Sequence, residues 1–248
     1  MPGTAPPERA ATDDSADTGA SRPVVVFDLD GTLVDTAPDL AASLNQCLQR
    51  RNLPPTDLAL VRPHAGHGSR VMLREAYRRL GLPLTDAEME DQVACFLAHY
   101  AENIAQQSRP FPGAVAALDR LAAGRFTLAV CTNKSERLAD LLLAELRLKD
   151  RFAAICGADT VARKKPDPSH LTETLARAGG AATAALMVGD TATDIDAAAA
   201  AGIPSVLVDF GYAPDAAARA RATLVIEDYA ALDAACATRL IEAAASKP

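Results

Sequence analysis

Short runs of apolar residues recur along the chain and alternate with patterns that are typical of helices. The runs are 24–27, 126–131, 153–155, 185–188, 205–208 and 223–226, of which 153–155 is the weakest. Between two of them, Leu138, Leu142 and Leu146 recur every fourth residue, and Ser135 precedes them at a position that suits a helix N-cap. Apolar strands that alternate with helices favour a parallel sheet buried on both faces. The pattern therefore predicts an α/β fold.

One segment interrupts this alternation. Between about residues 37 and 108 no run favours a strand, and three stretches have helical periodicity: Leu40 to Leu48, Val71 to Leu80 and Glu88 to Gln107. An all-helical insertion directly after the first strand predicts a second, smaller domain over 37–108. Arg109–Gly113, which contains two prolines, is expected to be the hinge by which the chain returns to the sheet.

The sheet domain is accordingly expected to comprise residues 23–36 and 109–248. A chain of 248 residues is long enough for such a core together with a smaller domain. Residues 1–22 are rich in Pro, Ala, Thr, Asp and Ser and lack hydrophobic periodicity, so they are predicted to form a disordered tail.

Composition and charge exclude several classes of function. The net charge of −7 argues against nucleic-acid binding, which requires a basic stripe. No apolar stretch approaches the roughly 20 residues of a membrane span, and no apolar signal core is present, so no membrane partner is expected. The five cysteines are far apart and form no C-x-x-C pair, as expected for reduced thiols in the cytoplasm. A monomer or homodimer in the cytoplasm is predicted.

Polar residues stand at the carboxyl ends of the apolar runs, and in an open parallel sheet these ends share the edge where ligands bind. The first group is Asp28-Leu29-Asp30-Gly31-Thr32. Carboxylates two residues apart point the same way in a strand, and they can divide the labour of nucleophile and acid/base. Taken alone, the same run also suits a turn at Asp30 and Gly31 with a capping aspartate.

Three further groups suit a phosphate and a metal ion. Thr132 and Asn133 can donate hydrogen bonds to phosphate oxygens, and Lys165, directly before a proline, offers a positioned charge. Asp190 and Asp194 offer the carboxylate oxygens that Mg²⁺ prefers. Each group also has a structural alternative, namely a helix cap for the hydroxyl, amide and carboxylate groups and a solvated surface position for the lysine. Their coincidence at four strand ends favours one shared site.

Together these motifs resemble those of the haloacid dehalogenase-like superfamily, in the subgroup with a helical cap between the first and second motifs. The resemblance is carried by DLDGTLVDT at 28–36, Thr132 at a strand end, Lys165 in KPDP, and GDTATD at 189–194. It extends from Val24 to about Tyr229. It implies an α/β fold with a Rossmann-like parallel-sheet core, helices on both faces and an inserted all-helical cap domain.

The resemblance also implies a role for each motif residue. Asp28 would attack phosphorus and form an aspartyl-phosphate, while Asp30 would protonate the leaving oxygen and then activate water. Thr132 and Lys165 would bind the phosphoryl oxygens. The ligands implied for Mg²⁺ are Asp28, the backbone carbonyl of Asp30, Asp190 and, close behind, Asp194.

Within the superfamily, the chain most resembles the phosphoglycolate phosphatases. This resemblance rests on DLDGTLVDT, Pro38-Asp39-Leu40, the loop Gly66-His67-Gly68 and the return Phe111-Pro112-Gly113. It implies Mg²⁺-dependent hydrolysis of a small phosphomonoester, with 2-phosphoglycolate as the specific expectation. Related phosphatases for other sugar phosphates or for pyrophosphate share most of these features, so these substrates stay open.

The segment from His64 to Arg70 is expected to close over the site in the sheet domain. Gly66, His67 and Arg70 are candidate substrate contacts, together with His64, and they would meet a substrate carboxylate. The segment equally suits an exposed loop that ends in a helix cap.

The same residues also bear on other activities of the superfamily and on a binding role without catalysis. A β-phosphoglucomutase-like phosphomutase would share the aspartyl-phosphate and return the phosphoryl group to a sugar. Dehalogenases of the superfamily lack the second acid, so Asp30 argues against that activity. A phosphonate hydrolase would need a lysine in the cap, and residues 37–108 contain none. A catalytically silent binding module would not need competent residues in all four motifs.

Overall fold

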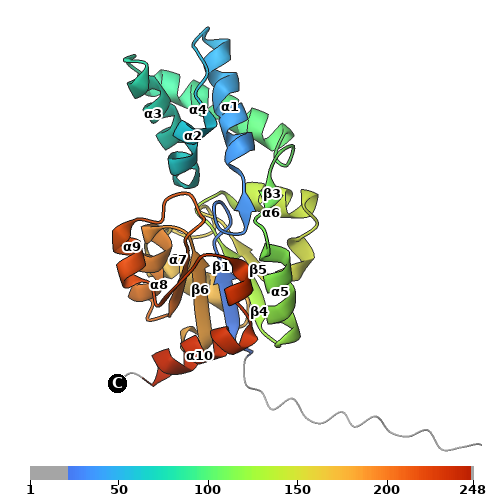
Figure 1. Cartoon of the computed structure of the whole chain (residues 1–248). Coiled ribbons are helices and arrows are strands. Elements are labelled where there is room, and N and C mark those ends of the chain that lie inside the picture. Colours follow the sequence, from blue (N-terminus) through green and yellow to red (C-terminus); the bar gives the residue numbers. More distant parts are fainter. Residues whose placement is uncertain (1–21, 247–248) are drawn as a thin grey trace, which may run out of the picture.

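The computed structural model describes residues 22–246, and the predicted disordered tail lies outside these residues except for Arg22. A six-stranded sheet surrounded by helices forms one part of the molecule, and four helices stand together above one edge of the sheet (Figure 1). Within the described residues, no helix is long and apolar enough to cross a membrane.

All six predicted strands are present, and they form one parallel sheet in the order β5-β4-β1-β6-β7-β8. Their bounds are β1 Val24–Phe27, β4 Thr127–Cys131, β5 Ala154–Cys156, β6 Ala185–Gly189, β7 Ser205–Val208 and β8 Leu224–Ile226. Phe27 at the end of β1 lies opposite Val130 of β4 and Val188 of β6. Residues that follow these three strands therefore leave the sheet at the same edge.

Helices cover both faces of the sheet, as expected. They are α5 Ala114–Ala123, α6 Glu136–Glu145, α7 Pro168–Arg177, α8 Ala192–Ala200, α9 Ala216–Arg221 and α10 Ala234–Ala245. Val25 and Phe27 pack in one apolar cluster with α5 and α10, whereas Val24 and Val26 pack in another with α7. Because side chains alternate along a strand, a fully apolar β1 supplies both cores.

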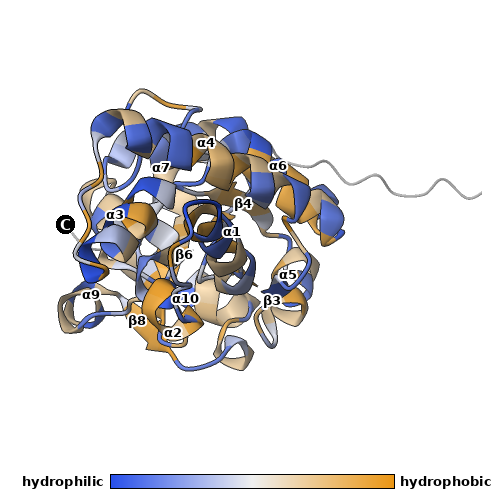
Figure 2. Cartoon of the chain, turned by 90° about the horizontal axis from the view of Figure 1, so that it is seen from above, coloured by the Kyte–Doolittle hydropathy of each residue, from blue (hydrophilic) through white to orange (hydrophobic). Residues whose placement is uncertain are grey.

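Helix α6 begins after Ser135, as predicted, although the Ser135 side chain makes no capping hydrogen bond. Leu138 and Leu142 lie on its buried face. Figure 2 shows both hydrophilic and hydrophobic residues on its ribbon, the pattern of a helix with one face in the core and one in solvent.

The residues from 37 to 108, which we call the helical insert, contain helices and no strand, and every one of them is described. The helices are α1 Ala37–Arg50, α2 Leu58–Val61, α3 Ser69–Arg79 and α4 Asp86–Glu102. A 3₁₀ helix, Arg62–His67, stands where a loop was expected. Helix α4 starts before the predicted Glu88 because Thr85 and Glu88 form a reciprocal capping box.

The insert is joined to the sheet by a two-stranded antiparallel ribbon, β2 Val34–Asp35 with β3 Arg109–Pro110. The predicted return hinge therefore begins as a strand. Asp39, at the start of α1, accepts hydrogen bonds from the backbone N–H groups of Gln107 and Ser108 and from the Ser108 hydroxyl. These bonds satisfy a buried carboxylate and tie the outgoing chain to the returning one.

Candidate active site

Three strands deliver the predicted acids and hydroxyl to one place. Asp28 directly follows β1, Thr132 follows β4, and Asp190 follows β6. Since β1 lies between β4 and β6, the three residues leave neighbouring strands at the carboxyl edge of the sheet. The convergence expected from the sequence is therefore present in the fold.

Lys165 reaches this edge from the loop before α7 and lies between two of the acids. Its Nζ donates hydrogen bonds of 2.6 Å to Asp194 Oδ1 and 2.6 Å to the Cys131 carbonyl oxygen, and it lies 3.0 Å from Asp28 Oδ1. Burial alone would lower the pKa of Lys165, but Asp194 and Asp28 raise it above its ordinary value. The ammonium group is therefore a fixed positive charge beside Asp28.

Asp28, Asp190 and Asp194 form a buried carboxylate cluster whose ligand oxygens all lie within 4.8 Å of one another. Burial raises the pKa of the Asp28 carboxyl to about 6, although Lys165 opposes the shift. Burial and the other two acids raise the pKa of Asp190 well above its usual range. Three carboxylates this close repel one another in a medium of low dielectric, and a cation between them would remove the repulsion.

A cluster that binds a metal ion needs a carboxylate oxygen that is free to coordinate it. Among residues 22–246, Asp28 Oδ1 is buried and has no hydrogen-bond partner, since the Lys165 contact lacks hydrogen-bond geometry. An oxygen-only donor set of this kind suits a hard divalent cation. The residues present therefore fit a bound metal ion.

Asp190 is held by donors from two separate segments. The Thr32 hydroxyl donates to Asp190 Oδ1 at 3.1 Å, and the backbone N–H of Tyr212 donates to Oδ2 at 2.7 Å. Gly31 has a φ of +84°, and a Cβ there would lie 2.4 Å from Asp190 Oδ2. The glycine of the first motif is required both by its backbone conformation and by the approach of this carboxylate.

Asp194 takes part both in a helix cap and in the acidic cluster. Its Oδ2 accepts hydrogen bonds from the N–H and the hydroxyl of Thr191, which caps α8. Its Oδ1 accepts from Lys165. The cap therefore fixes the carboxylate that positions the lysine.

Asp30 occupies a different environment from Asp28, although only one residue separates them. Lys134 Nζ donates to both Asp30 oxygens at 2.9 Å, and the Thr36 hydroxyl donates to Oδ1 at 2.6 Å. Sequence reasoning missed Lys134, although it follows Thr132 and Asn133 at the same strand end. Two neighbouring acids with separate cationic partners can perform separate tasks.

Thr132 and Asn133 are both placed at this edge. Thr132 Oγ1 accepts from the Lys134 N–H at 3.2 Å, and the side chain is buried. Asn133 Nδ2 donates to the Lys165 carbonyl oxygen at 3.0 Å, whereas its Oδ1 is buried without a hydrogen-bond partner in the described part of the chain. Asn133 therefore links the second and third motifs.

His170 and Tyr212 are two further residues that the sequence analysis did not single out. His170 Nδ1 accepts from the backbone N–H of Lys165, and burial together with Lys165 lowers the pKa of His170 to about 4, so the ring is neutral. The Tyr212 hydroxyl donates to Asp35 Oδ1 and accepts from the N–H groups of Thr36 and Ala37. Tyr212 thereby connects the Asp190 loop to the ribbon below the insert.

Comparison with known proteins identifies the chain. Residues 25–208 match the family described as haloacid dehalogenase-like hydrolases. The chain belongs to this family. A phosphoglycolate phosphatase of Mesorhizobium japonicum is 50% identical over 224 residues, which cover 90% of this chain and 99% of the relative. One from Agrobacterium fabrum is 41% identical over 224 residues, covering 90% of this chain and 96% of that relative.

Solved structures agree with this assignment. A crystal structure described as a predicted phosphoglycolate phosphatase from Haemophilus somnus 129PT has a TM-score of 0.78 and 30% identity. The match covers 86% of this chain and 97% of the chain in the crystal structure. Members of the family are generally dependent on a metal ion, in agreement with the acidic cluster of this hydrolase.

Two cavities of this hydrolase adjoin the acids. The Asp28 cavity, of about 180 Å³, is lined by Asp28, Lys164, Lys165 and Asp194, among others. The Asp30 cavity, of about 210 Å³, is lined by Asp30 and Lys134 and by apolar residues of the insert. Gly66 and Asn133 line both. The two cavities therefore lie side by side between the helical insert and the sheet.

The predicted contacts from the insert divide into two groups. Gly66 and His67 line the Asp28 cavity, as expected for residues above the site. His64 instead lines a small cavity inside the insert.

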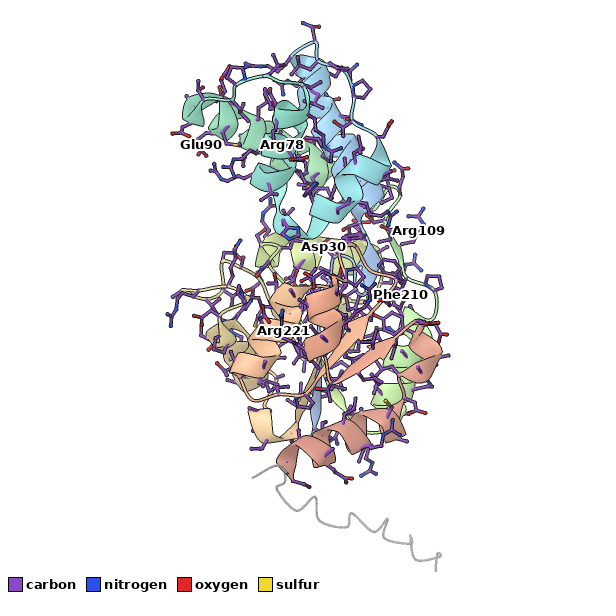
Figure 3. All side chains as sticks on the ribbon, turned by 60° about the vertical axis from the view of Figure 1, so that its left-hand side comes forward. Asp30, Arg78, Glu90, Arg109, Phe210 and Arg221 are labelled. Atoms are coloured by element: carbon purple, nitrogen blue, oxygen red, sulfur yellow. The ribbon has the colours of Figure 1, made fainter. Side chains whose placement is uncertain are left out.

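Arg70 lies away from both cavities, which conflicts with its expected contact to a substrate. It forms an exposed ion pair with Glu90. Figure 3 labels Glu90 on the insert, well above Asp30 at the junction with the sheet domain. The cause is helical phase, since α3 begins at Ser69 and turns the next side chain toward α4.

Proposed function

We propose that this hydrolase is a Mg²⁺-dependent phosphatase that cleaves a small phosphomonoester through an aspartyl-phosphate on Asp28. The observation that carries the proposal is the position of Asp28, with one oxygen unbonded, beside Lys165 and the acids Asp190 and Asp194. The relatives named phosphoglycolate phosphatase support 2-phosphoglycolate as the substrate and glycolate and phosphate as the products.

In the first step, a carboxylate oxygen of Asp28 attacks phosphorus while the bond from phosphorus to the leaving oxygen breaks. Asp30 gives its proton to that oxygen. Lys165, and the hydroxyl of Thr132, would hold the phosphoryl oxygens. Phosphoryl transfer depends mainly on such positioning and on neutralisation of charge, because a phosphate dianion is repelled by a carboxylate.

In the second step, Asp30 takes a proton from water as the water oxygen attacks phosphorus. The bond between phosphorus and Asp28 breaks, and the carboxylate is restored as phosphate leaves. One residue can serve as acid and then as base because each step returns the proton state that the other needs.

The metal ion that we propose is Mg²⁺, and Asp28, the backbone carbonyl of Asp30, Asp190 and Asp194 would hold it. When bound, Mg²⁺ neutralises negative charge on the phosphate and the carboxylates. This role agrees with the raised pKa values of Asp28 and Asp190, which come first from burial and then from the neighbouring acids of the cluster.

We also propose that residues 37–108 act as a cap over a core formed by 23–36 and 109–248. The ribbon of β2 and β3 and the shared lining of the two cavities support this division. We place the enzyme in the cytoplasm, where its five free cysteines would stay reduced.

The proposal predicts that 2-phosphoglycolate gives the highest kcat/KM in a panel with hexose phosphates, nucleotides and pyrophosphate. Initial rates of phosphate release with Mg²⁺ measure this. A best substrate other than 2-phosphoglycolate would refute that assignment, and accumulation of a sugar bisphosphate would indicate a mutase.

The proposal also predicts that EDTA abolishes phosphate release and that Mg²⁺, but not Ca²⁺, restores it, because Ca²⁺ takes a looser geometry. Full activity in EDTA would refute the metal site.

A further inference from the structure

The Asp30 cavity lies where the leaving group of a phosphomonoester has to lie. Attack by Asp28 brings the phosphoryl group beside Lys165, and Asp30 protonates the departing oxygen, so the departing alcohol lies on the Asp30 side. The cavity measures about 210 Å³ and shares Gly66 and Asn133 with the Asp28 cavity. It is smaller than the roughly 300–1,000 Å³ of pockets for drug-sized ligands, so it suits a small leaving group.

Lys134 is the only cation among the described residues that line this cavity. Its side chain is 6% exposed, and its two hydrogen bonds to Asp30 use two of the three donors of an ammonium group. Apart from Lys134 and Asp30, the lining is uncharged. Its large apolar members are Leu40, Met72, Phe96 and Leu97.

Tyr100 of α4 supplies a second donor to the same cavity. Tyr100 is 1% exposed, and among residues 22–246 its hydroxyl makes no hydrogen bond of regular geometry, although it lies close to the Lys134 ammonium group. The centroid of the Tyr100 ring lies 4.7 Å from Lys134 Nζ. Buried hydroxyls are normally paired, so an unpaired one at the wall of a cavity calls for a partner from a ligand.

We propose that Lys134 and Tyr100 bind a carboxylate on the leaving group and so select phosphate esters of small hydroxy acids over esters of neutral alcohols. A buried cation with one donor not used by Asp30, beside a neutral donor and apolar side chains, favours an anion over a neutral group of the same shape. This inference rests on the proposed phosphatase activity and names the residues of that site that determine its specificity.

The native protein tests the proposal with a matched pair of substrates, 2-phosphoglycolate and its neutral amide, 2-phosphoglycolamide. The two differ in the charge of the leaving group and little in its size. We expect kcat/KM to be at least about tenfold higher for the carboxylate, the usual effect of one hydrogen bond to a charged group. Equal values would overturn the proposal.

Hydrolysis of p-nitrophenyl phosphate separates this inference from the proposed function. Its leaving group has no carboxylate and departs readily. Release of nitrophenolate together with equal kcat/KM values for the matched pair would refute the anion site and leave the phosphatase intact. No release from any of the three compounds would refute the phosphatase, and the anion site with it.

Tyr100→Phe removes only the hydroxyl, so the folded protein loses no hydrogen bond of regular geometry and, apart from the contact with Lys134, no polar interaction. We expect the ratio of kcat/KM between carboxylate and amide to fall about threefold or more, through a higher KM for the carboxylate. Tyr77→Phe is the matched control, because Tyr77 of α3 also has a buried, unpaired hydroxyl but lines a different cavity. An equal ratio in Tyr100→Phe and Tyr77→Phe would count against Tyr100.

Lys134→Met and Lys134→Arg test the charge itself. Lys134→Met should bring the carboxylate-to-amide ratio close to one, whereas Lys134→Arg should keep a preference for the carboxylate. Because Lys134 also holds Asp30, both substrates can lose rate, and only the ratio is diagnostic. An equal loss on both substrates in Lys134→Met would show that Lys134 acts through Asp30 alone and would overturn its role in recognition.

Discussion

Replacing Asp28 by asparagine is expected to abolish turnover while the protein stays folded. Asparagine has nearly the same shape, but it lacks the carboxylate oxygen that attacks phosphorus, so kcat should fall by more than about a hundredfold. Initial rates on 2-phosphoglycolate and on p-nitrophenyl phosphate measure the loss. Retention of more than about a hundredth of the native rate would show that Asp28 is not the nucleophile.

The stability of Asp28→Asn provides its own control. Burial raises the pKa of Asp28 to about 6 from the ordinary 3.8, so the folded state prefers the neutral carboxyl. At pH 7 the ionised form therefore weakens the fold, and a neutral amide should remove that effect. We expect the thermal midpoint in EDTA to equal or exceed that of the native protein, which separates a lost nucleophile from a lost fold.

Replacing Lys165 by methionine is expected to lower both turnover and stability. The ammonium group is buried, bonds to Asp194 and lies 3.0 Å from Asp28 Oδ1. Methionine keeps much of the volume but leaves two buried carboxylates without their cation, a kind of change that costs about 3–5 kcal/mol. Turnover should also fall about 100- to 1,000-fold, because a positioned charge at the phosphoryl group is lost. Urea unfolding and initial rates check the two effects.

The pH dependence of stability sharpens this second prediction. Asp28 binds a proton more tightly in the folded than in the unfolded chain, so its contribution to stability is lost as pH rises from about 4 through about 6. Without Lys165, which lowers the pKa of Asp28, the Asp28 carboxyl should hold its proton more tightly still, and the loss of stability in EDTA should be larger at pH 8 than at pH 5. Lys164→Met, at the exposed neighbour, is the control. An unchanged unfolding free energy at pH 8 would contradict the placement of Lys165.

The sheet was predictable from the sequence because its central strands β1, β6 and β7 are buried on both faces. Val24–Phe27 is entirely apolar, and its two sets of alternate residues enter different cores. Ala154–Cys156 was the weakest prediction because it has only three residues, which carry little pattern. Helix ends were less certain, since the capping box at Thr85 moved the start of α4 to Asp86.

The core of the site was predictable because each motif residue directly follows a strand or stands before a proline. Lys134 was missed because its role depends on Asp30, 104 residues away in sequence. Tyr100 was missed for the same reason, since only the packing of α4 on the sheet domain brings it to Lys134.

Arg70 was expected at the site, but the structure places it elsewhere. A basic residue in a glycine-containing segment suggested a contact to a substrate, but the phase of a helix decides which way its side chains point. Ser69 begins α3, and Arg70 pairs with Glu90 on the neighbouring helix. Gly66 and His67 precede the helix and do line the Asp28 cavity.

The most direct test of the account is to trap the phosphoryl group on Asp28. Asp30→Asn removes the base of the second step, and p-nitrophenyl phosphate needs little help from an acid in the first. Rapid acid quench with Mg²⁺ should give a burst of about one nitrophenolate per protein molecule and phosphate on the peptide that contains Asp28. Nitrophenolate release with no phosphate on that peptide, or with phosphate on another residue, would contradict the account.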